Sequence, residues 1–490
     1  MKFLYYDLIF LVAFGLFLII FLSKRRKNLK REGILYLYRT KVGLRIIDYV
    51  GNKYKKILGI LQYISITLGY ILMVGVFYML VRVVYTYLKF PEITDLIKAP
   101  PLVPLIPYFP KIFGVQSFFP PFYFTYFIIS ILIVATVHEF AHGIFAKSKG
   151  LRIKSTGFAF LGLLIGAFVE PDEKEMIKKS KVDQMSILSA GVFANVITAV
   201  VFIFIAWVFL TLAFVQAGAI FDNYAVVAIN VSSITSIGDY NTENLNPEGI
   251  LDLIENKKIE PSLFIPLNGE SINLTEIRID DEKYFVDVET FKSRLKTGGD
   301  FFAVYGDFPA IRAGLRGTII EFDGVEIKNQ EDLSQEISKC NPGDEVEIKT
   351  KFNNVTLSYN LQLVESPNQE GRAFLGISSS GFSKFNLVQG IIYRFFNFFE
   401  DPSIALEPKF NSNFVIFIKD LLWWIIIINV LVALFNMLPA GFLDGGRFFF
   451  LTVLALVKRE KTAKRISKII IYLILLIIFM IMASWLLALI

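Results

Sequence analysis

The chain has 490 residues, of which 54% are hydrophobic, and its mean hydropathy is +0.55. Several apolar runs of about 20 residues exclude a purely soluble protein and predict a multi-pass membrane protein. The single cysteine excludes an intrachain disulfide framework and a Cys-x-x-Cys metal site. The net charge of +6 does not predict a nucleic-acid partner, because the excess Lys and Arg side chains lie in loops that face anionic lipid.

Six apolar runs predict transmembrane helices, roughly at residues 4–22, 59–86, 122–146, 185–215, 414–438 and 466–489. Dense clusters of Lys and Arg follow the first and third runs and precede the last one. Such clusters concentrate in cytoplasmic loops, so they place the N-terminus and the long segment after the fourth run outside. The basic loop after the first run also favours a retained anchor over a cleaved signal peptide.

The segment at residues 216–412 differs in charge from the rest of the chain. It contains 30 Asp and Glu against 17 Lys and Arg, a net charge of −13. Short alternating apolar runs, a turn at Asp323-Gly324 and a helix that begins near Asn329 predict a domain of strands and helices. Residues 222–295 give mixed signals that fit either an insertion or a degenerate second copy of the module at residues 296–365.

Part of this segment, residues 296–365, resembles a PDZ domain. The resemblance rests on Pro309-Ala310, Ala313-Gly314-Leu315 and Asp323-Gly324. It implies a groove in which an extended peptide pairs with a sheet edge. The alternative is a small packing module that binds no ligand.

The only two histidines of the chain lie together near the end of the third apolar run. His138 and His142 are four residues apart, and Glu139 directly follows the first. On a helix the two imidazoles share one face and can bind one metal ion, while the carboxylate holds a water molecule. Because unpaired ionisable groups are costly inside a bilayer, this pattern predicts a metal site rather than a structural cluster.

A catalytic zinc site needs a third protein ligand and an open position for water. The chain has no other histidine, and Cys340 lies in the outer segment, so a carboxylate within an apolar run must serve. Asp444 lies in such a run, which is broken by Pro439 and Gly441; non-helical backbone at this depth must face protein or a wet cavity. Helix rise places both His138 and Asp444 in the cytoplasmic half of the membrane.

With these residues, the GVFAN sequence that ends at Asn195 and the stretch from Asn436 to Asp444 make the chain resemble the site-2 proteases, which are intramembrane zinc metalloproteases. The resemblance implies that Zn2+ is bound by His138, His142 and Asp444, with Glu139 as the general base. It also implies that Asn195 and Asn436 donate hydrogen bonds near the scissile peptide, although helix packing is an alternative for Asn195. Relatives commonly have a second proline two residues after the first, and this chain has Gly441 at that position instead.

Residues 157–172 resemble the membrane-reentrant β-loop of the same family. Either its edge pairs with an unwound substrate, or the loop only shields the site. Residues 385–400 contain aromatic and apolar side chains around a few polar ones and predict an interfacial amphipathic helix.

The expected fold is a multi-pass α-helical membrane protein with about six transmembrane helices and an extramembrane α+β domain that contains a PDZ-like fold. We expect residues 1–121 to form an extra transmembrane pair with its connectors. The protease core is expected in two parts, at residues 122–215 and 413–457, with the extramembrane domain at residues 216–412 between them. Residues 458–490 are expected to form a cytoplasmic basic loop with the last transmembrane helix.

The expected activity is hydrolysis of peptide bonds within transmembrane segments of single-span membrane proteins that were already cleaved outside. Membrane lipid is the other expected partner, and the cell membrane the location. One alternative is a membrane metalloprotease of another family, with its third ligand at a glutamate such as Glu276. The other is a PDZ-containing membrane receptor or scaffold with a structural metal.

Overall fold

The computed structural model describes residues 2–89, 106–108, 120–243, 245–257, 259–267, 270–297, 301–353, 355–378, 403–441 and 443–488. The chain divides into two compact units, the first comprising Met1–Leu210 with Asn413–Ile490 and the second Thr211–Ser412. The interfacial helix predicted at residues 385–400 lies outside the described residues.

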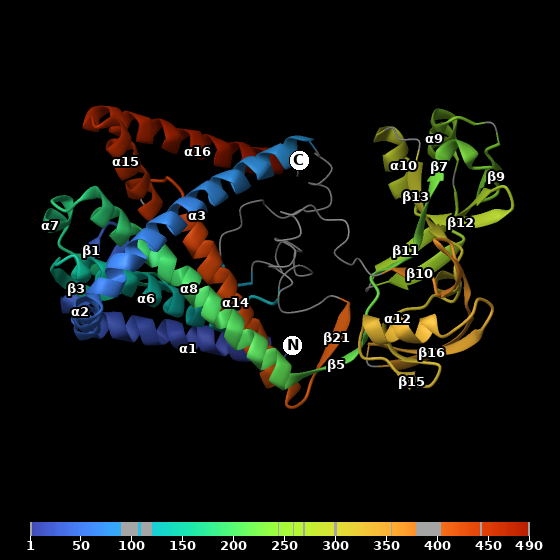
Figure 1. Cartoon of the computed structure of the whole chain (residues 1–490), viewed down its shortest axis with the longest axis horizontal. Coiled ribbons are helices and arrows are strands. Elements are labelled where there is room, and N and C mark those ends of the chain that lie inside the picture. The colour runs from blue at the N-terminus through green and yellow to red at the C-terminus, as the bar shows by residue number, and fades with distance from the viewer. Residues whose placement is uncertain are drawn as a thin grey trace. The chain divides into compact units, whose positions relative to one another are not determined.

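The first unit is helical (Figure 1). Among the described residues, six helices are long and apolar enough to cross a membrane, in agreement with the six predicted spans. They are α1 (Lys2–Lys24), α3 (Lys55–Lys89), α6 (Phe124–Ser148), α8 (Lys181–Ala213), α14 (Ser412–Asn436) and α16 (Glu460–Ala488). Shorter helices are α2 (Leu44–Lys53), α7 (Glu173–Ile177) and α15 (Asp444–Val457). The chain is therefore a multi-pass membrane protein with an additional β-rich region.

Two of the long helices form the interior of this unit. The most apolar window of α14 is 56% buried and that of α6 is 39% buried, against 17% for α8 and 11% for α1. Ala141 and Phe145 of α6 belong to a buried cluster with Val192 of α8 and with Met437 and Phe448 near α15. The helix that carries both histidines is thus enclosed by protein, while its outer neighbours keep apolar surface for lipid.

Helix α6 is capped by a residue of another helix. Its own N-cap residue, Tyr123, makes no side-chain cap hydrogen bond. Asp7 of α1 is 1% exposed, and its carboxylate accepts hydrogen bonds from the backbone N–H groups of Phe124 (2.9 Å) and Thr125 (2.8 Å). It also accepts from the hydroxyls of Thr125 (2.6 Å) and Tyr108 (2.5 Å). The carboxylate satisfies the unpaired donors and the positive dipole end of α6, so α1 fixes where this helix begins.

A four-stranded antiparallel sheet lies in the same unit, in the order β1-β2-β3-β4. Its strands are β1 (Leu29–Glu32), β2 (Leu35–Thr40), β3 (Ile153–Leu161) and β4 (Leu164–Pro171). The predicted β-loop supplies β3 and β4, while β1 and β2 come from the basic loop after α1. Strand β2 pairs with β3 from Tyr36 opposite Phe160 to Thr40 opposite Thr156. Four strands give the hairpin a stability that two alone would lack.

The second unit contains two larger sheets. One runs β7-β13-β12-β11-β8-β9, with β10 paired to β11; the other runs β17-β16-β14-β5-β21, with β15 paired to β14. The strands of the first are β7 (Val226–Asn230), β8 (Ser236–Ile237), β9 (Tyr240–Asn241), β10 (Leu263–Leu267), β11 (Glu270–Ile279), β12 (Glu282–Val286) and β13 (Phe301–Gly306). Those of the second are β5 (Phe214–Ala219), β14 (Thr318–Phe322), β15 (Val325–Glu326), β16 (Glu345–Phe352), β17 (Val355–Gln362) and β21 (Ile404–Pro408).

Four helices and two small sheets complete this unit. The helices are α9 (Pro247–Asn256), α10 (Val288–Thr297), α11 (Pro309–Arg312) and α12 (Gln330–Ser338). The small sheets pair β18 (Val364–Ser366) with β19 (Gln369–Phe374), and β20 (Ile377–Ser378) with β6 (Asn223–Tyr224). Two buried apolar clusters lie in this unit, and one of them joins residues of the second sheet with Leu274 and Phe285 of the first.

Both larger sheets repeat one order of elements. A short hairpin, β8–β9 or β14–β15, precedes a helix, α9 or α12, which a second hairpin follows. Both helices begin at an asparagine cap: Asn246 accepts from the Gly249 N–H at 2.8 Å, and Asn329 accepts from the Asp332 N–H at 2.9 Å. This shared order is what a degenerate second copy predicts for residues 222–295. The PDZ-like interpretation of residues 296–365 stays a prediction; β13, inside that range, pairs in the first of the two sheets.

Candidate metal centre

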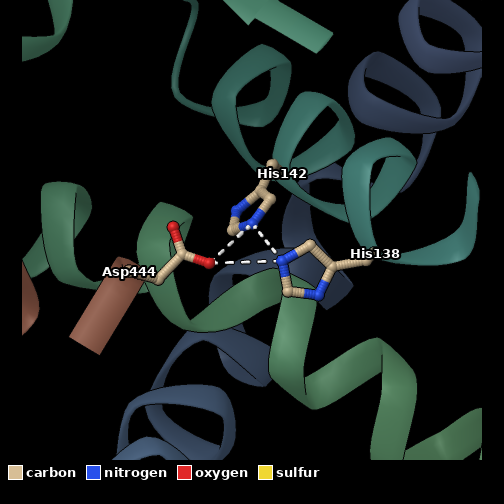
Figure 2. Close-up of side chains that lie close together, drawn as sticks. All are labelled: His138, His142 and Asp444. Carbon is tan, nitrogen blue, oxygen red and sulfur yellow. Dashed lines mark hydrogen bonds and ion pairs between the residues drawn. The ribbon is translucent and has the colours of Figure 1, made fainter. Parts of the chain in front are cut away.

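The two histidines of α6 and the first residue of α15 converge on one point (Figure 2). His138 Nε2 and His142 Nε2 each lie 3.2 Å from Asp444 Oδ2. The two Nε2 atoms are 3.0 Å apart. His138 is 6% exposed, so this cluster is enclosed within the helices. Among the described residues it is the single group of three or more side chains with the potential to hold a metal ion.

The three ligand atoms fit a zinc ion. Zinc binds imidazole nitrogen and carboxylate oxygen at about 2.0–2.2 Å in a tetrahedron, which sets the ligand atoms about 3.3–3.5 Å apart. The observed separations of 3.0 and 3.2 Å are shorter by only a few tenths of an ångström. The cluster has three members in the part of the chain that is described, so one tetrahedral position stays open, as in catalytic zinc sites.

A backbone carbonyl orients His142. Its Nδ1 lies 2.6 Å from the Ile187 carbonyl oxygen of α8. A carbonyl only accepts, so Nδ1 carries the proton and donates it, which leaves Nε2 deprotonated for the metal. This outer contact therefore selects the tautomer that a metal ligand requires.

Asn195 of α8 makes the equivalent contact with His138. Its amide Nδ2 is 3.1 Å from His138 Nδ1, while its Oδ1 is buried without a partner. A metal on Nε2 requires a proton on Nδ1, so the amide oxygen belongs at this position; exchanging the two amide atoms gives the Nδ1–H group its acceptor. Asn195 is 0% exposed and borders neither cavity beside the metal cluster. The contact seen here is with a metal ligand, and its predicted donation to substrate stays a prediction.

Gly191 lies one turn before Asn195 on the same face of α8. A Cβ atom at this position would lie 2.5 Å from both His138 Cε1 and His142 Nε2. A side chain there would push the two imidazoles out of position. The glycine and the asparagine of the GVFAN motif thus serve one purpose, because the first allows α8 to approach the histidines and the second holds one of them.

Asp444 is placed by a tight turn between α14 and α15. Asn436 ends α14, and Leu443 is the N-cap residue of α15. A Cβ on Gly445 would collide with the carbonyl of Met437, and one on Gly446 with that of Ala440. The paired glycines therefore allow the start of α15 to pack directly on the preceding turn. This packing directs the Asp444 carboxylate at the histidines.

Glu139 contacts the edge of the sheet. Its Oε2 accepts a hydrogen bond from the Val169 N–H of β4 at 2.9 Å. A cavity of about 280 Å³ borders Glu139, His138 and Asn436 and has apolar walls from α6, including Val134. Asn436 Nδ2 lies 3.4 Å from His138 Nε2, so it faces the metal position as well as the cavity.

A second, larger cavity of about 710 Å³ also borders the metal cluster. Glu139, His142 and Asp444 form part of its wall, and charged residues of the sheet, such as Arg39 and Glu170, form another part. The general-base candidate Glu139 therefore borders both cavities.

Comparison with known proteins agrees with this geometry. The sequence profile of Peptidase family M50 matches residues 126–481, which is more than half of the chain. The chain belongs to Peptidase family M50. This is the family of the site-2 proteases that the three sequence motifs resemble.

Two relatives show how far the similarity of this M50 peptidase extends. An uncharacterized protein of Methanocaldococcus jannaschii is 27% identical over 473 residues, which cover 94% of this chain and 89% of that protein. The zinc metalloprotease RasP of Shouchella clausii is 27% identical over 169 residues, which cover 29% of this chain and 40% of RasP. Together with the two imidazoles and one carboxylate, these findings support a metalloprotease with Zn2+ as its cofactor.

The alternative third ligand of this M50 peptidase is engaged elsewhere. Glu276 lies in β11 of the second unit, where its carboxylate pairs with Arg278 at 2.8 Å and Lys283 at 3.3 Å. These cations lower the pKa of Glu276, although its burial opposes them. The metal cluster of the described chain contains Asp444 instead.

Sequence reasoning missed several residues that support the site, Gly191 and Val169 among them. Gly191 had a signal, because it lies four residues before Asn195 and glycine on a helix face permits close packing. Val169 had none, because its contribution is a backbone N–H group that any residue except proline supplies.

Proposed function

We propose that this protein is an intramembrane zinc metalloprotease that hydrolyses peptide bonds within transmembrane segments of single-span membrane proteins. The observation that carries the proposal is the position of the His-His-Asp cluster inside an apolar helix. His138 lies ten residues before the end of the 25-residue helix α6, or about 15 Å from that end by helix rise. A soluble substrate would not reach this depth, whereas a membrane-embedded segment lies at the same level.

The chemistry follows from the ligands and the acid beside them. Bound zinc supplies a Lewis acid that lowers the pKa of water and polarises a carbonyl group. Glu139 borders both cavities, so it can take a proton from water and return it to the leaving amine. Asn436 directs its amide at the metal position and stabilises the negative charge that develops on the substrate oxygen.

The β4 edge supports a mode of substrate binding. Strand β4 has β3 on one side and no strand partner on the other within the described chain. The Val169 N–H points away from β3 toward Glu139, and by strand alternation those of Ala167 and Ile165 point the same way. The Val169 N–H already donates to Glu139, so an unwound substrate segment pairs with the Ala167 and Ile165 donors and thereby exposes its peptide bond, which a helix would shield.

The second unit supports a filter for substrates. A cavity of about 370 Å³ lies between α12 and the β19 strand, with Leu333, Ile337 and Phe374 among its lining residues. A helix beside a strand edge suits an extended peptide end, as the PDZ-like interpretation implies. We place this unit and the N-terminus outside the cell membrane, with the active site toward the cytoplasm. The filter then admits substrates that another protease has already shortened outside.

The experiment uses the purified full-length protein in proteoliposomes with two single-span substrates. One span contains Gly and Asn in its middle, and the other contains only leucine. The wild type should cleave the first within its apolar segment and the second far more slowly, because leucine stabilises the helix that must unwind. The Glu139→Gln variant should cleave neither. Equal cleavage of both spans, or cleavage only outside the apolar segment, would contradict the proposal.

A further inference from the structure

A cavity that none of the three candidate metal ligands borders lies between α15 and the first turns of α16. The two helices form a hairpin through Lys458, which has a left-handed φ of 58° (Figure 1). The cavity has a volume of about 610 Å³, and its lining includes Phe450, Lys464, Arg465 and Tyr472. Neither the metal ligands nor Glu139 border it. It is therefore a site separate from the metal centre.

The cations of this cavity have spare binding capacity. Lys464 pairs with Glu460 at 2.6 Å on the helix surface, where both side chains are about two-thirds exposed. Arg465 and Lys468 make neither an ion pair nor a hydrogen bond with any described residue. Two unpaired cations at the end of an apolar span attract an anion that lies at the membrane surface.

A buried hydroxyl points to a built site rather than a diffuse basic surface. Ser467 is 8% exposed and borders the cavity, yet its Oγ has no hydrogen-bond partner in the described structure. A buried hydroxyl without a partner costs free energy that a bound acceptor would recover. A phosphate oxygen held by the neighbouring cations would be such an acceptor.

The remaining walls suit an acyl chain. Phe450, Ile469, Ile471 and Tyr472 line the cavity, and Ile469 and Tyr472 are 58% and 63% exposed. A free phosphate ion would gain nothing from these apolar groups. A phospholipid would place its headgroup between the cations and its first methylene groups on the apolar side chains.

We propose that the α15–α16 hairpin binds one anionic phospholipid, with the headgroup phosphate held by Arg465, Lys468 and the Ser467 hydroxyl. Asp444 is the first residue of α15, so the lipid seals the membrane side of the same hairpin that presents the third metal ligand. The site is separate from the proposed proteolysis, and lipid binding is measurable in a protein that cleaves nothing.

The test measures lipid retention by the purified, delipidated full-length protein in detergent. Native mass spectrometry counts bound phosphatidylglycerol, the anionic probe, or phosphatidylethanolamine, the zwitterionic one, and a titration gives each affinity. The Arg465→Gln/Lys468→Gln variant removes the two cations. The Ser467→Leu variant fills the cavity and keeps every charge. The Arg459→Gln/Lys461→Gln variant removes two cations of the same basic loop that do not line the cavity.

The wild type should retain one phosphatidylglycerol per chain and prefer it to phosphatidylethanolamine. The Arg465→Gln/Lys468→Gln and Ser467→Leu variants should each bind it about tenfold or more weakly, and the Arg459→Gln/Lys461→Gln control should bind as the wild type does. Equal weakening in the control, or unchanged binding by Ser467→Leu, would overturn the built site. Displacement of the lipid by inorganic phosphate would assign the site to a free anion and overturn the lipid.

Discussion

Asn195 is expected to hold His138 rather than the substrate, and replacing it separates the two roles. The Asn195→Ala variant removes the group beside His138 Nδ1, 3.1 Å away in a fully buried position. The Nδ1–H of a metal-bound imidazole then has no acceptor. Leaving a buried donor unsatisfied costs about 1–3 kcal/mol, which corresponds to roughly 5- to 150-fold in an equilibrium constant.

The expected result is therefore a loss of zinc affinity of about 10- to 100-fold, the range typical of outer partners of metal-binding histidines. Competition with a chromophoric chelator measures this affinity in detergent, without a substrate. A peptidase assay at saturating zinc then measures what remains of turnover. At saturation, turnover should largely recover, since the catalytic groups are still present.

Asn429 provides a matched control. It is also 0% exposed, its Nδ2 donates to the Ile425 carbonyl within α14, and its Oδ1 has no described partner. Asn429→Ala should lose stability comparable to that lost by Asn195→Ala but keep the wild-type zinc affinity. If Asn195→Ala binds zinc as tightly as the wild type while its turnover falls, the asparagine acts on the substrate and the reasoning is refuted.

The packing around the site leads to three further predictions. Asp7→Ala should lower the free energy of unfolding by about 2–4 kcal/mol, because the first N–H groups of α6 lose a buried acceptor, and Asp7→Asn should lower it less. Thermal unfolding in detergent measures both variants. Equal stability of wild type and Asp7→Ala would contradict the capping role. Gly191→Ala should reduce bound zinc severalfold in metal analysis, because its Cβ would lie 2.5 Å from His142 Nε2. Full zinc content would show that α8 can shift to make room for the added methyl group. Ala167→Pro should keep zinc, the β3 pairing and the Val169 donation to Glu139 but lower kcat/KM on a transmembrane substrate about tenfold, because it removes an N–H on the unpaired edge. Unchanged kcat/KM would exclude substrate pairing there.

The convergence of His138, His142 and Asp444 was predictable because the chain contains so few candidate metal ligands. Two histidines four residues apart in an apolar run favour a metal site, and Asp444 followed by elimination among carboxylates within such runs. The six long helices followed from hydropathy, since runs of about 20 apolar residues are rare outside membrane-spanning helices. Local composition carries this information, so no long-range contact had to be known.

The supports of the site were not predictable, because they join residues far apart in the chain. The cap of α6 comes from Asp7, and the partner of the β3 strand begins more than a hundred residues earlier, with Thr40 opposite Thr156. Neither contact leaves a periodic pattern in the sequence. They also give the first transmembrane segment and the basic loop after it a structural role in holding the site.

Residues 222–295 resisted assignment for a related reason. Strands β8 and β9 have two residues each, too few for alternation to be recognised. Strand β7 pairs with β13, and Phe301 of β13 lies opposite Asn230 of β7. The sheet therefore depends on a pairing between strands at the two ends of this segment, which no local pattern reveals.

The most direct test of the account is the zinc content per chain of the purified wild type and of the Glu139→Gln and Asp444→Ala variants. The account predicts about one zinc in the first two and a strong loss in the third, because Asp444 supplies a ligand and Glu139 does not. Full zinc content in Asp444→Ala, or loss in Glu139→Gln, would show that the roles of the two carboxylates are wrongly assigned. A wild type without zinc after metal-replete preparation would contradict the metalloprotease itself.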